Sequence, residues 1–196
     1  FNCPGQNFAY ADIEGNIALW HSGNNPAKWK RQGMFISDGT DPRYDWQGFI
    51  PHDQKPHMKN PNRGYIGSAN QHPTTSDYPY FLSEFYWASF RWNQIHTRLD
   101  TLQSATINDM LDIQLDNRSV FAEKNMPVIL RTWKNNLKNN IEKQAFTILS
   151  DWDYEMDGHS PAPTMYRYWY TLLEELTWED DLGKDNENFI WPYRDK

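Results

Sequence analysis

Hydrophobic residues alternate with smaller or more polar residues near the start of the chain. The alternating large residues are Phe8, Tyr10, Ile17 and Leu19. The three residues 14–16, Glu-Gly-Asn, separate the two runs and are typical of a tight turn. The pattern therefore predicts a β-hairpin over residues 7–23, with Asn7 at the start of its first strand.

A long segment without a regular period follows the hairpin. Residues 24–64 are rich in Pro, Gly, Asn and Asp, which favour turns and loops. Its large apolar residues are Trp29, Phe35, Tyr44, Trp46, Phe49 and Ile50. These anchors favour a loop packed onto the rest of the molecule. Residues 64–70, Gly-Tyr-Ile-Gly-Ser-Ala-Asn, then predict a short strand.

From residue 82 onward the spacing of apolar residues changes to the helical period of about 3.6. A first stripe is formed by Trp92, Ile95, Leu99 and Leu102. Thr106, followed three residues later by Asp109, is an N-cap pattern that opens a second helix reaching Gln114.

Two further helical stretches are predicted in the second half of the chain. Pro127 is suited to the first turn of a helix, and the stripe behind it continues to Ile141. Its members are Val128, Leu130, Trp133, Leu137 and Ile141, with Ala145, Ile148 and Trp152 continuing the period. Residues 160–163, Ser-Pro-Ala-Pro, break the pattern. A last helix carries Tyr166, Trp169, Leu172, Leu173 and Leu176.

Strands first and helices afterwards indicate an α+β fold. We expect residues 1–81 to form a hairpin and long-loop segment and residues 82–196 a helical segment, together one compact unit. The hairpin and the strand at 64–70 would be edge pieces of a sheet whose other strands lie outside this chain. The tryptophans in phase with the helical stripes, Trp92, Trp133, Trp152 and Trp169, are expected in the core.

Composition narrows the classes of function. The 196 residues suit one domain, and a formal charge of −7 without a Lys/Arg stripe argues against nucleic-acid binding. No apolar run approaches the about 20 residues of a membrane span. The one cysteine, Cys3, excludes an internal disulfide framework. Because the chain starts with neither an initiator Met nor a signal peptide, we expect it to be cut from a longer protein.

The residues by themselves identify no complete catalytic site. Residues 66–70 do not match the Gly-x-Ser-x-Gly elbow of serine hydrolases. His52, Asp53 and His57 lie in a Pro-broken loop at a spacing that fits no metal-binding helix or finger, so we interpret the histidines as solvated. The remaining candidate carboxylates, interpreted as surface or capping groups, are Asp41, Asp45, Asp151, Asp153 and Glu155.

The hairpin also carries a specific resemblance. Asn7-Phe8-Ala9-Tyr10-Ala11-Asp12, followed by Gly15-Asn16-Ile17, resembles the β-chain of the penicillin acylase (penicillin amidase) family of N-terminal-nucleophile hydrolases. The likeness continues through residues 45–51 and 60–70 and more loosely through Arg91 and residues 105–114. It implies a segment of the family's four-layer αββα sandwich, with some strands and a helical lobe.

The resemblance also implies roles for particular residues. The family nucleophile is a Ser at an N-terminus created by autocatalytic cleavage, with its own α-amine as base; no residue of this chain matches it, so the chain alone is expected to be inactive. Asn7 would donate from its side-chain NH₂ to the oxyanion. Lys28, or Arg31 in its place, would occupy the position of a family basic residue, commonly Arg, and Asn70 would brace the site.

The substrate class and partners follow from the same resemblance. The complete enzyme would hydrolyse a small acyl amide such as a β-lactam side chain or an acyl-homoserine lactone. It would need the remaining β-chain and the α-chain of the same precursor, and it would be periplasmic or secreted, with no nucleic acid or membrane partner. No cofactor is implied beyond a structural calcium in the complete enzyme. Asp12 is a conceivable calcium ligand but more simply a turn residue.

Two other classes of function remain open at this point. The ten tryptophans, with many Asn, Asp and Tyr residues, also suit a carbohydrate-binding or adhesion module without catalysis. A purely structural helical domain is the third interpretation. The acylase hypothesis is distinguished by its dependence on Asn7.

Overall fold

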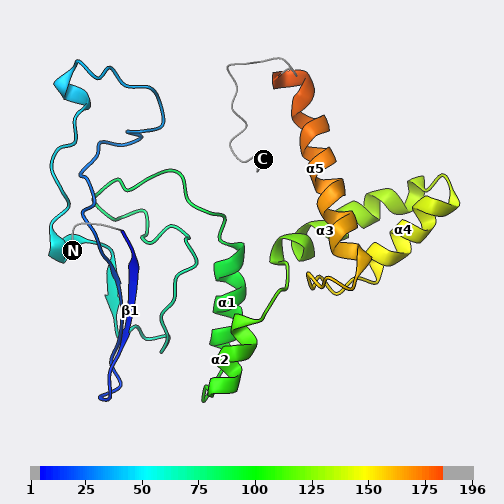
Figure 1. The fold of residues 1–196 in the computed structure, drawn as a ribbon, viewed down its shortest axis with the longest axis horizontal. Coiled ribbons are helices and arrows are strands. Elements are labelled where there is room, and N and C mark those ends of the chain that lie inside the picture. Colours follow the sequence, from blue (N-terminus) through cyan, green and yellow to red (C-terminus); the bar gives the residue numbers. More distant parts are fainter. Residues whose placement is uncertain (1–4, 183–196) are drawn as a thin grey trace. The chain divides into compact units, whose positions relative to one another are not determined.

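The computed structural model describes residues 5–182 (Figure 1). These residues form two compact units that meet in sequence between Gln114 and Leu115. The first unit holds a small antiparallel sheet, long loops and two helices, and the second holds three helices. The predicted α+β class is confirmed. The change from loops to helices, expected at residue 82, lies inside the first unit, where the first helix begins at Phe90.

The predicted hairpin is present. Strand β1, Asn7–Ala11, pairs antiparallel with β2, Ile17–His21, and in this register Asn7 lies opposite His21. Along both strands, larger side chains alternate with smaller or polar ones, a pattern that suits a pleated sheet. All five residues of β1 are exposed, whereas those of β2 are half-buried.

Asp12 closes the turn between the two strands. Its carboxylate accepts hydrogen bonds from the backbone N–H groups of Glu14 at 3.0 Å and Asn16 at 2.8 Å, and from Asn16 Nδ2 at 2.8 Å. These bonds favour the charged form, so the Asn16 donors hold the pKa of Asp12 below its ordinary value. Gly15 supplies the positive φ of 85° that the turn requires.

The third strand was not predicted. β3, His57–Lys59, pairs antiparallel with β2 and gives the sheet order β1-β2-β3. Its three residues, His57, Met58 and Lys59, follow Pro56 and contain no β-branched or aromatic hydrophobic residue, so pairing with β2 decides their conformation.

The prediction of a strand at residues 64–70 is wrong, since this segment pairs with no strand in the described part of the chain. The segment packs on helix α1, Phe90–Asp100, instead. A Cβ on Gly67 would lie 2.9 Å from the Trp92 ring, so a larger residue there would require the ring to shift.

The apolar anchors of the long segment between β2 and β3 are packed only in part. Ile50 is 2% exposed and Trp29 is half-buried, with its ring 6.0 Å from that of Tyr44. The other predicted anchors are exposed: Phe35, Tyr44, Trp46 and Phe49. Two short 3₁₀ helices, Pro42–Tyr44 and His52–Gln54, interrupt the loop. The side chain of Asp41 caps the first by accepting from the Arg43 N–H.

The two predicted helices of the first unit are confirmed. α1 spans Phe90–Asp100 and α2 spans Ile107–Gln114. The Thr106 N–H and hydroxyl donate to the Asp109 carboxylate at 2.7 and 2.6 Å, and the Asp109 N–H donates back to the hydroxyl at 3.3 Å. The predicted cap therefore satisfies backbone donors at the start of α2.

The second unit contains α3, Val120–Trp133, a 3₁₀ turn at Lys134–Asn136, α4, Asn140–Ser150, and α5, Pro161–Leu182. The prediction that Pro127 opens a helix is wrong, because Pro127 lies inside α3. Ser119 provides the true start, its hydroxyl accepting from the Ala122 N–H at 3.2 Å.

The last helix is confirmed and begins at Pro161, so the Pro-rich stretch forms its first turn and the break ends at Ser160.

The core of the second unit lies between its helices. Its buried residues are Ala122, Met126, Leu149, Trp152, Ala162 and Tyr166. Trp152 is fully part of this core, and Trp133 and Trp169 pack against it while half-buried. Burial raises the pKa of the Tyr166 hydroxyl to about 12. Trp92 is half-buried in the first unit, against Gly67.

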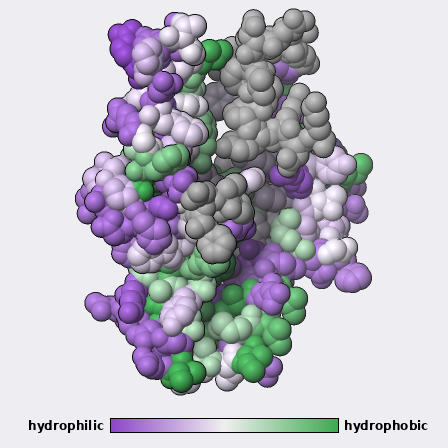
Figure 2. Space-filling model, turned by 60° about the vertical axis from the view of Figure 1, so that its left-hand side comes forward, coloured by the Kyte–Doolittle hydropathy of each residue, from purple (hydrophilic) through white to green (hydrophobic). Residues whose placement is uncertain are grey.

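Many large apolar side chains remain exposed, and Figure 2 shows hydrophobic residues at the surface among hydrophilic ones. Ile13, Ile36 and Ile107 are 105%, 104% and 81% exposed. No helix among the described residues is long and apolar enough to cross a membrane. Cys3 and the aromatic residues near the C-terminus, Phe189, Trp191 and Tyr193, lie outside the described residues.

Candidate functional site

Asn7 lies at the edge of a small hollow of about 60 Å³ in the first unit. The lining residues are Asn7, Leu19, His21, Pro56, His57, Met58, Ser68, Gln71 and Pro73. The sheet register explains the first of these, since residues directly opposite in an antiparallel pair point to the same face. Asn7 and His21 form such a pair, and Leu19 lies two residues before His21 on that face.

The side chain of Asn7 has one hydrogen-bond partner in this hollow. Its Nδ2 donates to Ser68 Oγ over 2.9 Å. The bond joins residues 61 positions apart in the sequence and ties β1 to the segment after β3. The NH₂ group has two hydrogens, so the second one is available to another acceptor.

A buried lysine lies beside the same hollow. Lys55 is 5% exposed, and its ammonium donates to the Gly23 carbonyl oxygen at 2.5 Å. Burial, and secondly the charge of Lys55, lower the pKa of His21 below its ordinary value. The buried Nδ1 of His21 has no hydrogen-bond partner in the part of the chain that the structure describes. His21 is therefore neutral at pH 7.

Asn70 lies two residues beyond Ser68 and is exposed. Its side-chain Oδ1 accepts a hydrogen bond from Arg91 Nη2 at 2.7 Å, and the same nitrogen donates to the Ala69 carbonyl oxygen at 3.1 Å. Asn70 adopts a φ of 64°, a conformation that Asn tolerates better than most residues. Asn70 thus connects the segment bearing Ser68 to helix α1.

Lys28 lines a different hollow from Asn7. This second hollow, of about 440 Å³, also contains Lys30 and His72. The Lys28 ammonium lies 5.8 Å from the centre of the Phe81 ring, a cation–π arrangement. Arg31 has its guanidinium 5.9 Å from the centre of the Phe35 ring.

The two loop histidines stack on Trp20. The ring centres of His52 and His57 lie 5.4 and 4.1 Å from that of Trp20. Both histidines are exposed, as interpreted from the sequence, but His57 belongs to β3, directly opposite Trp20, and not to a loop. Among residues 5–182, no group of His, Cys, Asp and Glu is arranged to hold a metal ion.

Asp12 does not fit a calcium ligand. Its two oxygens already accept bonds from Glu14 and Asn16, and Tyr10 Oη donates to Oδ2 at 3.1 Å. Asp153 likewise closes a local turn, accepting from the Glu155 N–H at 3.0 Å.

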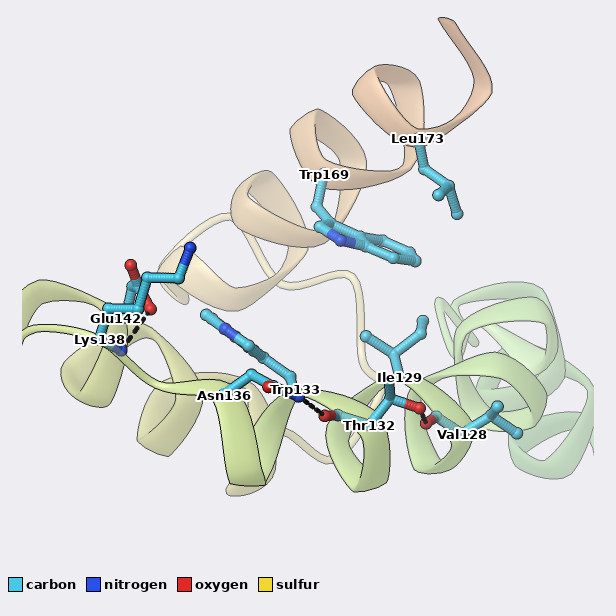
Figure 3. Close-up of a pocket in the computed structure, with 9 residues that line it drawn as sticks. All are labelled: Val128, Ile129, Thr132, Trp133, Asn136, Lys138, Glu142, Trp169 and Leu173. Atoms are coloured by element: carbon cyan, nitrogen blue, oxygen red, sulfur yellow. Dashed lines mark hydrogen bonds between the residues drawn. The ribbon is translucent and has the colours of Figure 1, made fainter. Parts of the chain in front are cut away.

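A larger groove lies in the second unit, between α3 and α5 (Figure 3). Its volume is about 680 Å³, and the rings of Trp133 and Trp169 project into it from the two helices. The polar groups at its end are engaged locally: Asn136 Nδ2 donates to the Thr132 carbonyl at 2.9 Å, and Glu142 accepts from the Lys138 N–H at 2.8 Å. The groove is apolar and offers no group suited to catalysis.

The hollow at Asn7 is therefore the better candidate for chemistry, because it combines a free amide hydrogen, a hydroxyl and a neutral imidazole. Sequence reasoning missed Ser68, His21 and Lys55. Only Ser68 fell within a motif of the resemblance, and no local pattern links it to Asn7.

Comparison with known proteins agrees with the resemblance. The family profile described as penicillin amidase matches residues 1–195. Penicillin G acylase of Escherichia coli is 27% identical over 87% of this chain and 21% of its own length. The acyl-homoserine lactone acylase QuiP of Pseudomonas putida is 36% identical over 92% of this chain and 23% of its own length.

A solved structure shares the fold. The thermostable penicillin G acylase from Alcaligenes faecalis matches with a TM-score of 0.70 and 19% identity, over 92% of this chain and 34% of that one. The chain spans about a fifth to a quarter of the length of the curated relatives described above.

Proposed function

The chain belongs to the penicillin amidase family, and we propose that the complete protein is an amidohydrolase that cleaves an acyl amide through an acyl-enzyme. The observation that carries this proposal is the position of Asn7, with one amide hydrogen held by Ser68 and the other free at the edge of a small polar hollow. Relatives named for penicillin G and for acyl-homoserine lactones support an acyl amide as the substrate.

The nucleophile comes from another part of the precursor. It is an N-terminal Ser, Thr or Cys whose α-amine, with a pKa of roughly 7.7–8.0, accepts the proton of the side chain, which for Ser is the hydroxyl proton. The hydroxyl oxygen attacks the amide carbon, the C–N bond breaks as the amine leaves with the proton, and water then releases the acid from the acyl-enzyme. Both the attack of the hydroxyl and the later attack of water place negative charge on the former carbonyl oxygen.

Asn7 stabilises that charge. Its free Nδ2 hydrogen donates to the oxyanion, a bond that is stronger to the charged transition state than to the neutral substrate. Lys28 and Asn70 act around this centre rather than on the reacting atoms. Asn70 does so by holding the segment next to Ser68 through Arg91, and Lys28 by ordering the loop that contacts Phe81.

We propose that the enzyme is periplasmic or secreted and is assembled from an α-chain and a β-chain that includes residues 1–196. The chain by itself lacks the nucleophile and is inactive. We assign no cofactor, and no calcium ligand among the described residues.

The test starts from the protein expressed from its complete reading frame. Intact mass and N-terminal sequencing should give two chains, the one containing residues 1–196 beginning with Ser, Thr or Cys. Purified enzyme is assayed with penicillin G and with an N-acyl-homoserine lactone, beside Asn7→Ala. Loss of an oxyanion donor should lower kcat by about 10²–10³-fold. A single unprocessed chain, or an Asn7→Ala variant with unchanged kcat, contradicts the mechanism.

A further inference from the structure

We propose that Ser68 is a positioning residue that orients the side-chain amide of Asn7; this inference rests on the oxyanion role proposed for Asn7. The contact is the 2.9 Å hydrogen bond from Asn7 Nδ2 to Ser68 Oγ. Both side chains line the same hollow. Ser68 does not touch the reacting atoms and acts only through Asn7.

The chemistry of an amide side chain explains why orientation matters. The final torsion of Asn joins an sp³ carbon to a planar group, so its rotation is broad and the group takes two opposite orientations. One orientation presents an N–H to the oxyanion, and the other presents Oδ1, whose lone pairs repel it. In the structure the Ser68 hydroxyl accepts from Nδ2, and this bond restrains the amide in the orientation that leaves the second Nδ2 hydrogen free.

The backbone that carries Ser68 is well anchored. Ala69, the next residue, is 6% exposed, and its N–H donates to Gln71 Oε1 at 2.7 Å. Its carbonyl oxygen accepts from Arg91 of helix α1, which also holds Asn70. Ser68 therefore offers its hydroxyl from a segment tied to a helix, whereas Asn7 lies on an exposed edge strand.

The position of Asn7 and Ser68 at the surface allows an effect on catalysis to be distinguished from an effect on stability. Asn7 and Ser68 are both exposed within residues 5–182, and neither belongs to the buried core there, so losing the hydrogen bond between them should change the free energy of unfolding little. A structural bond would affect the melting temperature, whereas an orienting bond affects kcat. The amide would still be present without Ser68, but only part of its population would be oriented for catalysis.

The experiment uses the complete, processed enzyme and a pair of variants of equal shape. Ser68→Thr keeps the hydroxyl, and Ser68→Val replaces it with a methyl group. We expect kcat for penicillin G to fall about tenfold in Ser68→Val, part of the loss for a missing donor, with KM and Tm unchanged. Ser68→Thr should retain kcat within about twofold. Ser68→Ala, which adds no bulk, should behave as Ser68→Val does.

A double-mutant cycle completes the test. In the Asn7→Ala background, Ser68→Ala should cause no further loss of kcat, because the group that it orients is absent. Equal losses in both backgrounds, or unchanged kcat in Ser68→Ala and Ser68→Val while Asn7→Ala loses 100-fold or so, would overturn the positioning role and leave the proposed function intact. An Asn7→Ala variant with full activity would overturn both.

Discussion

Lys55 is an unusual residue to find beside His21. A buried ammonium is costly, and this one has the Gly23 carbonyl oxygen as its hydrogen-bond partner and no carboxylate within ion-pairing distance among the described residues. Its charge acts on the neighbouring imidazole, adding to burial in disfavouring the protonated form of His21. An exposed histidine gains a proton near its ordinary pKa. In the hollow at Asn7, His21 gains its proton only at a lower pH.

The first prediction concerns this histidine. The pKa of His21 should lie below the ordinary value of 6.5 when measured by NMR on histidine-labelled protein. Between pH 6.5 and the lower folded-state pKa, His21 binds a proton in the unfolded chain but not in the folded chain. The His21 contribution to the free energy of unfolding is therefore lost as pH falls from 6.5 to the folded-state pKa, and is unchanged above pH 7.

Lys55→Met provides the matched variant for His21. It removes the charge and keeps an unbranched apolar chain in the buried position, so the pKa of His21 should rise. It should remain below the ordinary value, because burial is the larger cause of the shift. A His21 that titrates at or above 6.5 in the unmodified protein would show that the imidazole is solvated.

At the residue level, the sequence identified Asn7 as a candidate site residue but not the side chains around it. Asn7 was found because the motif around it resembles a family in which that position has a role. Ser68 lies 61 residues away, and a serine that accepts a bond from a distant amide leaves no periodic or local trace in the sequence. Asn70 came from the same resemblance, but its contact with Arg91 depends on how the segment packs on α1.

At the level of elements, helices with complete local signals were predictable. Both the apolar stripe and the Thr106–Asp109 cap of α2 are short-range features, and they decide the start of that helix. Strand β3 was not predicted, because His57, Met58 and Lys59 show no local strand pattern and become a strand only by pairing with β2. The prediction that Pro127 opens a helix was wrong. Proline suits the first turn of a helix, but the Ser119 cap and the buried Met126 start α3 before Pro127.

Pro127 supplies a prediction about α3. An interior proline cannot donate to the carbonyl of Glu123 and crowds it, and Pro127 is exposed with no core contact to lose. Pro127→Ala should raise the free energy of unfolding by roughly 1–3 kcal/mol, measured by urea titration of the complete protein. Arg131→Ala, an exposed position on the same helix, should change it by less than about 0.5 kcal/mol. A loss of stability in Pro127→Ala would mean that the proline ring packs against a segment beyond residues 5–182.

At the scale of the whole molecule, the described residues leave much apolar surface uncovered. Strand β1 is exposed along its length and has a ladder partner on one side, β2. Large side chains such as Ile13, Ile36 and Ile107 are almost fully exposed, and a groove of about 680 Å³ is open between α3 and α5. Surfaces of this kind mark contacts with other protein. The chain matches only about a fifth to a quarter of the length of these curated relatives. Under the proposal that it is part of a longer precursor, the rest of that precursor would cover these surfaces.

Residues 1–196 expressed alone should therefore behave differently from the complete protein. The isolated chain should bind an apolar dye strongly, show weak near-UV circular dichroism despite the helical far-UV signal, and unfold without a sharp transition, because its exposed apolar side chains have nothing to cover them. The complete processed protein should bind little dye and unfold cooperatively. Co-expression of residues 1–196 with the remainder as separate chains is the control, and it should restore the cooperative transition. A cooperative, dye-free isolated chain would show that its two compact units bury enough apolar surface to fold alone, and that the exposed side chains are not an interface.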